Sequence, residues 1–220
     1  GVMSRHRPEP LIFAAWMREL NRAVYADELG TLFPSFWGFR PGFTAFVLTR
    51  RREWCDDIRT SPVEDCKSRI AAALEAALDQ LAERFGEGFE DWRWGDMHRA
   101  RFRHRIFTGL PVLGRFADLE IATDGGGYTV NRGASRVADP ENPFADIHGP
   151  GYRAIYDLSD LAQSRFMIAT GQSGNPLSPH YGDLLRDWRD GRYMRLGLKR
   201  GDLEAAAEGV FRLVPPAPPA

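Results

Sequence analysis

The chain has 220 residues, 43% of them hydrophobic, which is enough to bury the core of a globular protein. A formal net charge of −1 supplies no basic excess, so neither nucleic acid nor an anionic membrane surface is expected as a partner. No apolar run approaches the roughly 20 residues that a membrane span needs, and the first residues lack the charged and then apolar pattern of a signal peptide.

Helical periodicity dominates the first ninety residues. Over residues 10–30 the apolar side chains recur at spacings of three and four, and Gly30 supplies a stop signal. Residues 42–56 are predicted to form a second helix. Packed helices are therefore expected to open the chain.

A third predicted helix has the clearest signals at both ends. Ser61 is a suitable N-cap, Pro62 fits the first helical position, and Glu64 would complete a capping box. An apolar stripe follows from Cys66 and ends before Gly86. We expect the helix to begin next to Ser61.

Two cysteines, Cys55 and Cys66, flank a segment that contains the turn-forming residues Thr60, Ser61 and Pro62. A disulfide here would close a short loop and stabilise the fold by roughly 2 to 3 kcal/mol. Two free, half-buried thiols are the alternative; the disulfide is favoured, and it would indicate an oxidising compartment. Zinc is disfavoured, because there is neither a C-x-x-C spacing nor a nearby histidine pair.

The pattern changes to a period of two over residues 97–105, which predicts a strand. One face would carry His98, Ala100, Phe102 and His104, and the other Arg99, Arg101, Arg103 and Arg105. A metal site using Asp96 and the two histidines would need a further ligand from elsewhere, so two packed, hydrogen-bonded histidines are preferred. The arginine row could bind an acidic ligand, but with 30 acidic residues in the chain an ion-pair ladder is favoured.

The second half reads as short strands with intervening turns. Strands are predicted over residues 116–122, 128–132, 152–157 and 165–170, and short helices over 183–193 and 202–208. The run from Asp124 to Tyr128 lacks the pattern of a phosphate-binding loop and predicts a hairpin or tight loop. We expect one α+β unit over residues 1–213, with a helical first half followed by antiparallel strands, and a disordered proline-rich tail over 214–220.

The segment GQSGNPLSPHYGD, residues 171–183, holds the residue types of a serine hydrolase. It misses the nucleophile elbow G-x-S-x-G, because Asn175 stands where the second glycine is required, and the prolines that follow oppose an immediate helix. Ser173 is therefore interpreted as a turn residue. The favoured reading is a structural loop in which Ser173, Asn175 and Ser178 bond backbone groups. A hydrolase that uses Ser173 or Ser178 with His180 stays as an alternative.

These residues also carry a resemblance. TGQSGNPLSPHYGDLLRDWRDGRY (residues 170–193), preceded by GPGYRAIYDLSDLAQSRFMIA (149–169), resembles the C-terminal signature of the penicillin acylase family, the large N-terminal-nucleophile amidases. EPLIFAAWMREL, the cysteines in WCDD and EDC, WGDMHRARFRH and GGGYTVN support it. One departure is Arg105, where the family commonly has proline.

The resemblance implies a precursor that is exported to the periplasm and cleaved into a small and a large subunit, with an αββα sandwich fold. The large subunit would begin with a serine whose hydroxyl attacks an amide carbonyl while its own α-amine serves as base. Implied substrates are small amides with an apolar acyl group: penicillins, cephalosporins and acyl-homoserine lactones. The implied nucleophile, oxyanion hole and structural calcium ligands lie upstream of the region that this chain resembles.

None of that machinery matches a position here. Gly1 has no side chain to act as a nucleophile, and the nitrogen of Ser4 is an amide without basicity. We therefore predict no catalytic, cofactor or metal residue in this chain, which looks like the last part of the large subunit and is expected to be inactive alone. Its expected partners are the rest of the large subunit and the small subunit. The isolated chain is expected to self-associate through the face left exposed.

A third possibility is that the chain has no catalytic function. A non-catalytic binding module could keep the family's C-terminal fold and lose the chemistry. Such a module should fold as a stable monomer with a closed apolar surface, whereas a part of a larger subunit should expose the face that packs on the rest.

Overall fold

The computed structural model describes residues 2–197 and 199–214, and its backbone forms two compact units, Gly1–Pro150 and Gly151–Ala220. Helices come first and antiparallel strands later, which confirms the predicted α+β class. A single unit over residues 1–213 stays a prediction. Apart from Val214, the predicted disordered tail lies outside the described residues.

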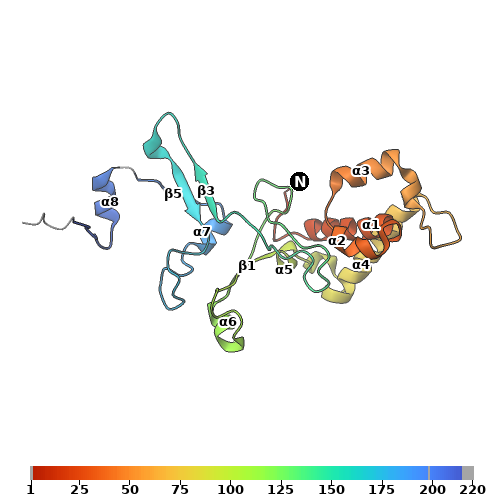
Figure 1. Cartoon of the computed structure of the whole chain (residues 1–220), viewed down its shortest axis with the longest axis horizontal. Coiled ribbons are helices and arrows are strands. Elements are labelled where there is room, and N and C mark those ends of the chain that lie inside the picture. Colours follow the sequence, from red (N-terminus) through yellow and green to blue (C-terminus); the bar gives the residue numbers. More distant parts are fainter. Residues whose placement is uncertain (1, 198, 215–220) are drawn as a thin grey trace, which may run out of the picture. The chain divides into compact units, whose positions relative to one another are not determined.

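Two long helices form the frame of the first unit: α1 (Glu9–Leu29) and α4 (Cys66–Phe85) lie side by side (Figure 1). Their apolar stripes face each other, and the indole N–H of Trp16 on α1 donates to the carbonyl of Ile70 on α4 at 3.0 Å. The buried side chains that the pair contributes include Leu11, Ala14, Leu20, Val24, Ala73, Ala77 and Leu81. Burying each large aliphatic side chain stabilises the fold by roughly 1.5 to 3 kcal/mol.

The predicted start of α4 was wrong. The helix begins at Cys66, and its N-cap is Asp65, whose carboxylate accepts from the backbone N–H of Ser68 at 2.7 Å in a capping box. Glu64 is engaged elsewhere, because its carboxylate accepts from the N–H of Asp57 at 3.0 Å and from the hydroxyl of Thr60 at 2.9 Å. The preceding loop thus uses the side chain that the sequence assigned to the cap.

Between the long helices the chain forms α2 (Phe33–Phe36), α3 (Pro41–Arg50) and the 3-10 turn η2 (Arg52–Cys55). The predicted helix over residues 42–56 is therefore divided at Arg51, whose φ of −132° and ψ of 53° are not helical. A Cys55–Cys66 disulfide joins the end of η2 to the start of α4, as favoured from the sequence.

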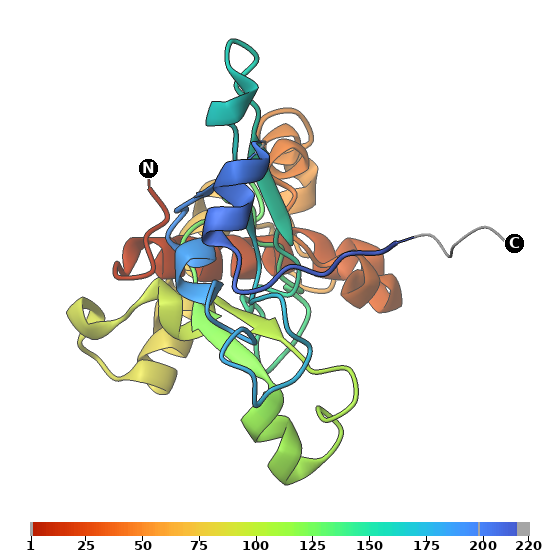
Figure 2. The same cartoon turned by 90° about the vertical axis from the view of Figure 1, so that its left-hand side faces the viewer.

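A two-stranded antiparallel sheet follows, formed by β1 (Arg99–Phe102) and β2 (Leu119–Ala122) with Arg99 opposite Ala122. Helix α6 (Pro111–Ala117) lies at the tip of this hairpin (Figure 2). The predicted strand over residues 116–122 is therefore shorter, because its first two residues end α6. Arg99 and Arg101 both pair with Glu120, so these two residues form the expected ion-pair ladder.

The predicted strand over residues 128–132 was wrong. Thr129 donates its backbone N–H to the carbonyl of Gly126 at 3.3 Å, and its hydroxyl donates to the carbonyl of Asn131 at 2.8 Å. These bonds curl the segment into a loop that follows Gly125, whose φ of 90° suits glycine. The expected tight loop after Asp124 is thus confirmed and extends further than predicted.

The second unit contains a three-stranded antiparallel sheet in the order β3 (Tyr152–Ile155), β4 (Arg165–Ile168), β5 (Met194–Arg195). Both predicted strands are present and each ends two residues earlier than expected. Helix α7 (Leu185–Arg189) follows the loop after β4 and buries its Trp188, and α8 (Arg200–Ala206) comes last.

The remaining short turns of helix are η1 (Gly30–Leu32), η3 (Phe89–Asp91), α5 (Trp94–Met97) and η4 (Leu161–Gln163). None of the helices within the described ranges is both long enough and apolar enough to cross a membrane.

Candidate functional site

The serine-containing segment of residues 171–183, called here the signature loop, connects β4 to α7. The backbone N–H of Ser173 donates to the carbonyl of His180 at 3.0 Å and closes the loop on itself. A Cβ atom on Gly171 would lie 2.2 Å from that carbonyl oxygen, so only glycine permits the approach. At the base of the loop, Leu184 N–H donates to the carbonyl of Thr170 at 2.8 Å.

Three side chains support the turns inside the signature loop, as predicted. The hydroxyl of Ser173 accepts from the N–H of Asn175 at 3.1 Å, and the side-chain oxygen of Asn175 accepts from the N–H of Leu177 at 3.0 Å. The hydroxyl of Ser178 accepts from the N–H of His180 at 3.2 Å. Each polar side chain thus satisfies a backbone donor two residues later.

The imidazole of His180 lies between two carboxylates. Its Nδ1 is 3.0 Å from Asp183, and its Nε2 is 3.6 Å from Glu208. The hydrogen bond that His180 donates to the carboxylate of Asp183 raises the pKa of His180, which favours the charged imidazolium. An imidazolium cannot accept a proton, and within the described residues no hydrogen bond joins this ring to the hydroxyl of Ser173 or Ser178. The geometry gives the serine-hydrolase alternative no support.

The other chemically rich segment, WGDMHRARFRH, places His98 in the core of the first unit. Its side chain is fully buried, and its ring stacks on Trp94 with 4.5 Å between centroids. The Nδ1–H donates to the carbonyl of Phe144 at 2.8 Å, which assigns the proton of the neutral ring to Nδ1. The side chain of His98 is therefore fixed in place by packing and by one backbone bond.

Beside His98 lies the carboxyl group of Asp146, which is 5% exposed. Its Oδ2 accepts from the hydroxyl of Thr123 at 3.3 Å, while its Oδ1 and the Nε2 of His98 have no hydrogen-bond partner within the part of the chain that the structure describes. Burial lowers the pKa of His98 and raises that of Asp146, so both groups are shifted toward their neutral forms.

A glycine brings a third segment into this cluster. A Cβ on Gly133 would lie 2.7 Å from the Nε2 of His98 and 2.8 Å from the Oδ2 of Asp146. The segments that contain His98, Gly133 and Asp146 therefore pack against one another without room for an added methyl group. We call these three residues with Thr123 the His98 cluster.

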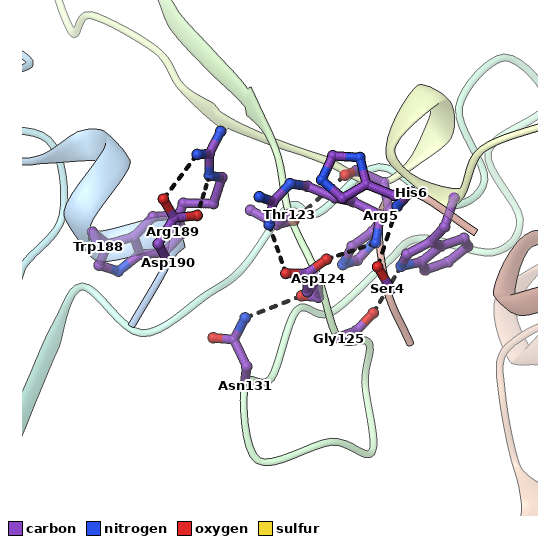
Figure 3. Close-up of polar contacts among 12 residues, drawn as sticks. Ser4, Arg5, His6, Thr123, Asp124, Gly125, Asn131, Trp188, Arg189 and Asp190 are labelled. Atoms are coloured by element: carbon purple, nitrogen blue, oxygen red, sulfur yellow. Dashed lines mark hydrogen bonds and ion pairs between the residues drawn. The ribbon is translucent and has the colours of Figure 1, made fainter. Parts of the chain in front are cut away.

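The start of the chain is fixed to the same region by Asp124 (Figure 3). Arg5 donates its backbone N–H to one oxygen of this carboxylate and its guanidinium N–H to the other, each at 2.6 Å. The indole N–H of Trp94 donates to the carbonyl of Gly125 at 2.8 Å. Ser4 is internal, and its hydroxyl accepts from the N–H of His6 at 3.4 Å.

The candidate metal ligands do not converge. His98 uses its Nδ1 for the carbonyl of Phe144, and the Nδ1 of His104 accepts from the N–H groups of Ile106 and Phe107, both at 3.2 Å. Asp96 is exposed. Among residues 2–197 and 199–214, no three His, Cys, Asp or Glu side chains are grouped to hold a metal ion.

Comparison with known proteins identifies the family. The model of the penicillin amidase family matches residues 1–205. The chain belongs to this family.

Two kinds of curated relative accompany that match. The acyl-homoserine lactone acylase QuiP of Pseudomonas syringae pv. tomato is 26% identical over 225 residues, which cover 93% of this chain and 26% of the relative. Penicillin acylase 2 proenzyme of Pseudomonas sp. is 31% identical over 124 residues, covering 55% of this chain and 14% of that protein. This penicillin amidase family chain thus spans about a quarter of the length of the QuiP relatives.

The thermostable penicillin G acylase of Alcaligenes faecalis has the same fold, with a TM-score of 0.53 at 18% sequence identity. The match covers 96% of this chain and 39% of that one. The mixed helical and antiparallel architecture of this penicillin amidase family member is accordingly similar to that of penicillin G acylase, an N-terminal-nucleophile hydrolase.

The sequence does not predict which residues contact Asp124 and His98. Asp124 was read only as the start of a glycine loop, and its partner Arg5 is 119 positions away. Asp146 carried no motif. Pairs of this kind have no signal in a single sequence, because the fold alone brings them together.

Proposed function

We propose that this chain is the C-terminal portion of the large subunit of an amidase that hydrolyses the amide bond of acylated small molecules. Acyl-homoserine lactones, penicillins and cephalosporins are the substrate classes proposed. The observation that carries the proposal is the coverage: 93% of this chain matches about a quarter of an acyl-homoserine lactone acylase. Its likeness to the C-terminal signature of the family supports the location at the end of the subunit.

Within such an enzyme the reaction would begin at a serine supplied by the remaining polypeptide. Its hydroxyl would attack the amide carbonyl, its α-amine would take the proton, and backbone or amide donors would stabilise the oxyanion. The described part of this chain supports a structural role, because its candidate serines bond backbone groups and its candidate histidine bonds carboxylates. The chain alone is therefore proposed to be inactive.

The proposed location is the periplasm. The Cys55–Cys66 disulfide supports it, since disulfides persist in oxidising compartments and are rare in the cytosol. The proposed partners are the rest of the large subunit and the small subunit.

Exposed apolar side chains around α6 favour one of the two alternatives. They support a surface that the rest of the protein covers, and they speak against a free-standing binding module. Ile106 is 74% exposed, Val112 80% and Phe116 59%, within eleven residues of one another. Apolar surface patches mark contact sites in soluble proteins, and these three exposed side chains lie close together in sequence. We expect the isolated chain to self-associate, and analytical ultracentrifugation showing a clean monomer would favour the binding module.

The activity test compares two proteins: this chain alone, and the same chain joined to the segments that the longer relatives carry. We expect only the longer protein to release homoserine lactone from an acyl-homoserine lactone or 6-aminopenicillanic acid from a penicillin. A fluorophosphonate probe applied to the chain alone separates the alternatives. Labelling at Ser173 or Ser178 with turnover by the chain alone would establish the stand-alone hydrolase and overturn the proposal.

A further inference from the structure

The first unit contains an apolar pocket that shares no residue with the His98 cluster. Four parts of the chain form it: the first residues, helix α1, the segment that leads into α3, and the loop of residues 124–128, called here the glycine loop. The residues that line it are Met3, Phe13, Ala14, Met17, Phe39, Pro41, Gly126, Gly127 and Tyr128. The lining contains no charged side chain, so a ligand is held there by exclusion of apolar surface from water.

A hydrogen bond joins two of the residues that line the pocket. The hydroxyl of Tyr128, in the glycine loop, donates to the carbonyl of Phe39 at 2.7 Å. Tyr128 is 71% exposed and Phe13 is 54% exposed, so two aromatic rings border the mouth and reach solvent. Two of the lining side chains, Met3 and Met17, are unbranched thioethers that adapt their shape to an occupant.

The size of the pocket selects among apolar occupants. Its volume is about 100 Å³. An apolar cavity of ~150 Å³ is large enough to stay dry and bind benzene, so a smaller one favours a few methylene groups over an aromatic ring.

We propose that this pocket binds the end of a short unbranched aliphatic acyl chain. The ligand class is an alkyl carboxylate or acyl amide whose polar head stays in water at the mouth while the terminal methylenes enter. The choice of an acyl group as the source of the aliphatic chain rests on the proposed function. The preference for an aliphatic chain rests only on the apolar lining and the volume of the pocket. Binding of the chain end does not require that the pocket adjoin the reacting amide.

The methionines provide a direct test on the chain as it is. Met3 and Met17 line the pocket, whereas Met97, Met167 and Met194 lie elsewhere, so the five methyl groups separate pocket binding from general effects. In protein labelled with ¹³C at the methionine methyls, titration with hexanoate should shift Met3 and Met17 saturably and leave the other three unchanged. Intermolecular NOEs should join the terminal methylenes to the same two methyls. Phenylacetate should bind at least about tenfold more weakly, a difference of about 1.4 kcal/mol.

A matched pair of glycine variants tests the location. Gly127 lines the pocket, and a Cβ there meets nothing within 4 Å, so Gly127→Leu adds a bulky side chain to the lining without straining the backbone, and we expect hexanoate binding to fall at least about tenfold. Gly109 is equally open but does not line the pocket, so Gly109→Leu should bind as the unaltered chain does.

Three results would overturn the inference: no saturable shift of Met3 or Met17 at millimolar hexanoate, equal shifts of all five methyls, or shifts without NOEs to the two pocket methyls. Preference for phenylacetate would reassign the ligand to aromatic acids. These readouts need no turnover, so failure of the proposed amidase activity would leave hexanoate binding intact, and failure of binding would leave the amidase proposal standing.

Discussion

The His98 cluster and the signature loop are equally rich in chemical residue types, yet the structure holds them by opposite means. His98 is fully buried, stacks on the ring of Trp94, donates to a backbone carbonyl, and lies against a glycine with no space for a methyl group. His180 is exposed, and the loop around it is held by hydroxyl and amide oxygens that accept backbone N–H groups.

The difference teaches that a serine, a histidine and an aspartate close together in sequence indicate turn chemistry as readily as catalysis. Short polar side chains bond their own backbone, whereas catalytic groups are assembled by the fold from distant segments. The His98 cluster is the one assembled from distant segments, and its polar side chains are buried. Neither region supplies an exposed nucleophile with a neutral base beside it.

Crowding at the glycines should separate the two regions most strongly. Gly133→Ala places a methyl group 2.7 Å from His98 in the core, and we expect a loss of about 2 to 3 kcal/mol in the free energy of unfolding. Gly171→Ala meets a backbone oxygen at 2.2 Å, so it should open the signature loop, seen as lost hydrogen-exchange protection of the Ser173 amide.

Each variant has an open glycine as its control. Gly127→Ala and Gly174→Ala meet no atom within 4 Å and should change the urea midpoint little. Equal destabilisation by Gly133→Ala and Gly127→Ala would show that the His98 cluster can relax, and that packing does not hold it as described.

Reduction of the disulfide should sharpen the contrast between a covalently closed loop and one closed by hydrogen bonds. The Cys55–Cys66 bond joins positions eleven apart, so replacing both cysteines by serine should cost about 2 to 3 kcal/mol of stability. Urea unfolding with and without dithiothreitol measures this. Dithiothreitol should have no further effect on the double variant, and the amide protection of the signature loop should stay unchanged throughout.

The two histidines should respond to pH in opposite directions. Burial lowers the pKa of His98, so as pH falls below about 6.5 the unfolded chain takes up a proton that the folded chain refuses, and stability is lost. The bond to Asp183 raises the pKa of His180, so its contribution is fully present below about pH 6.5 and is lost as pH rises through the folded pKa.

NMR titration of the ring protons follows each histidine directly. The ring of His98 should titrate at a lower pH, and that of His180 at a higher pH, than an ordinary histidine does. Asp183→Asn should lower the pKa of His180 toward its ordinary value and leave His98 unchanged. A raised pKa of His98 would mean that the buried carboxyl of Asp146 is ionised and pairs with it, which would contradict the neutral cluster.

The long helices could be predicted because their signals are local and repeated. The apolar stripes of α1 and α4 placed both helices, and the ends of α1 agree with the prediction within one residue. The start of α4 was predicted several residues too early. Glu64 was expected to cap the helix, but its carboxylate bonds within the loop between the two cysteines, and Asp65 caps the helix instead. Alternation likewise predicted the buried and exposed faces around β1, since His98 and Ala100 are buried while Arg101 and Arg103 are exposed.

What could not be predicted depends on contacts between distant positions. Helix α6 interrupts a run that reads as a strand, and residues 128–132 have strand-like composition but curl through the bonds of Thr129. The bond of Arg5 to Asp124 and the approach of Gly133 to His98 exist only in the folded chain. For the signature loop the sequence was sufficient, because each supporting bond spans two residues.

The smallest effect, and the one most directly about function, is expected from Ser173→Ala. It removes the hydroxyl that accepts from the N–H of Asn175, an exposed bond worth about 0.5 to 1 kcal/mol. In the complete enzyme, turnover per correctly folded active site should stay nearly unchanged, because the hydroxyl supports a turn. Ser178→Ala, which loses the equivalent bond to His180, should behave alike. Active-site titration combined with initial rates tests both. A variant that titrates as fully folded but has lost turnover would place Ser173 in the chemistry, and the two regions would then differ in catalytic role as well as in how they are held.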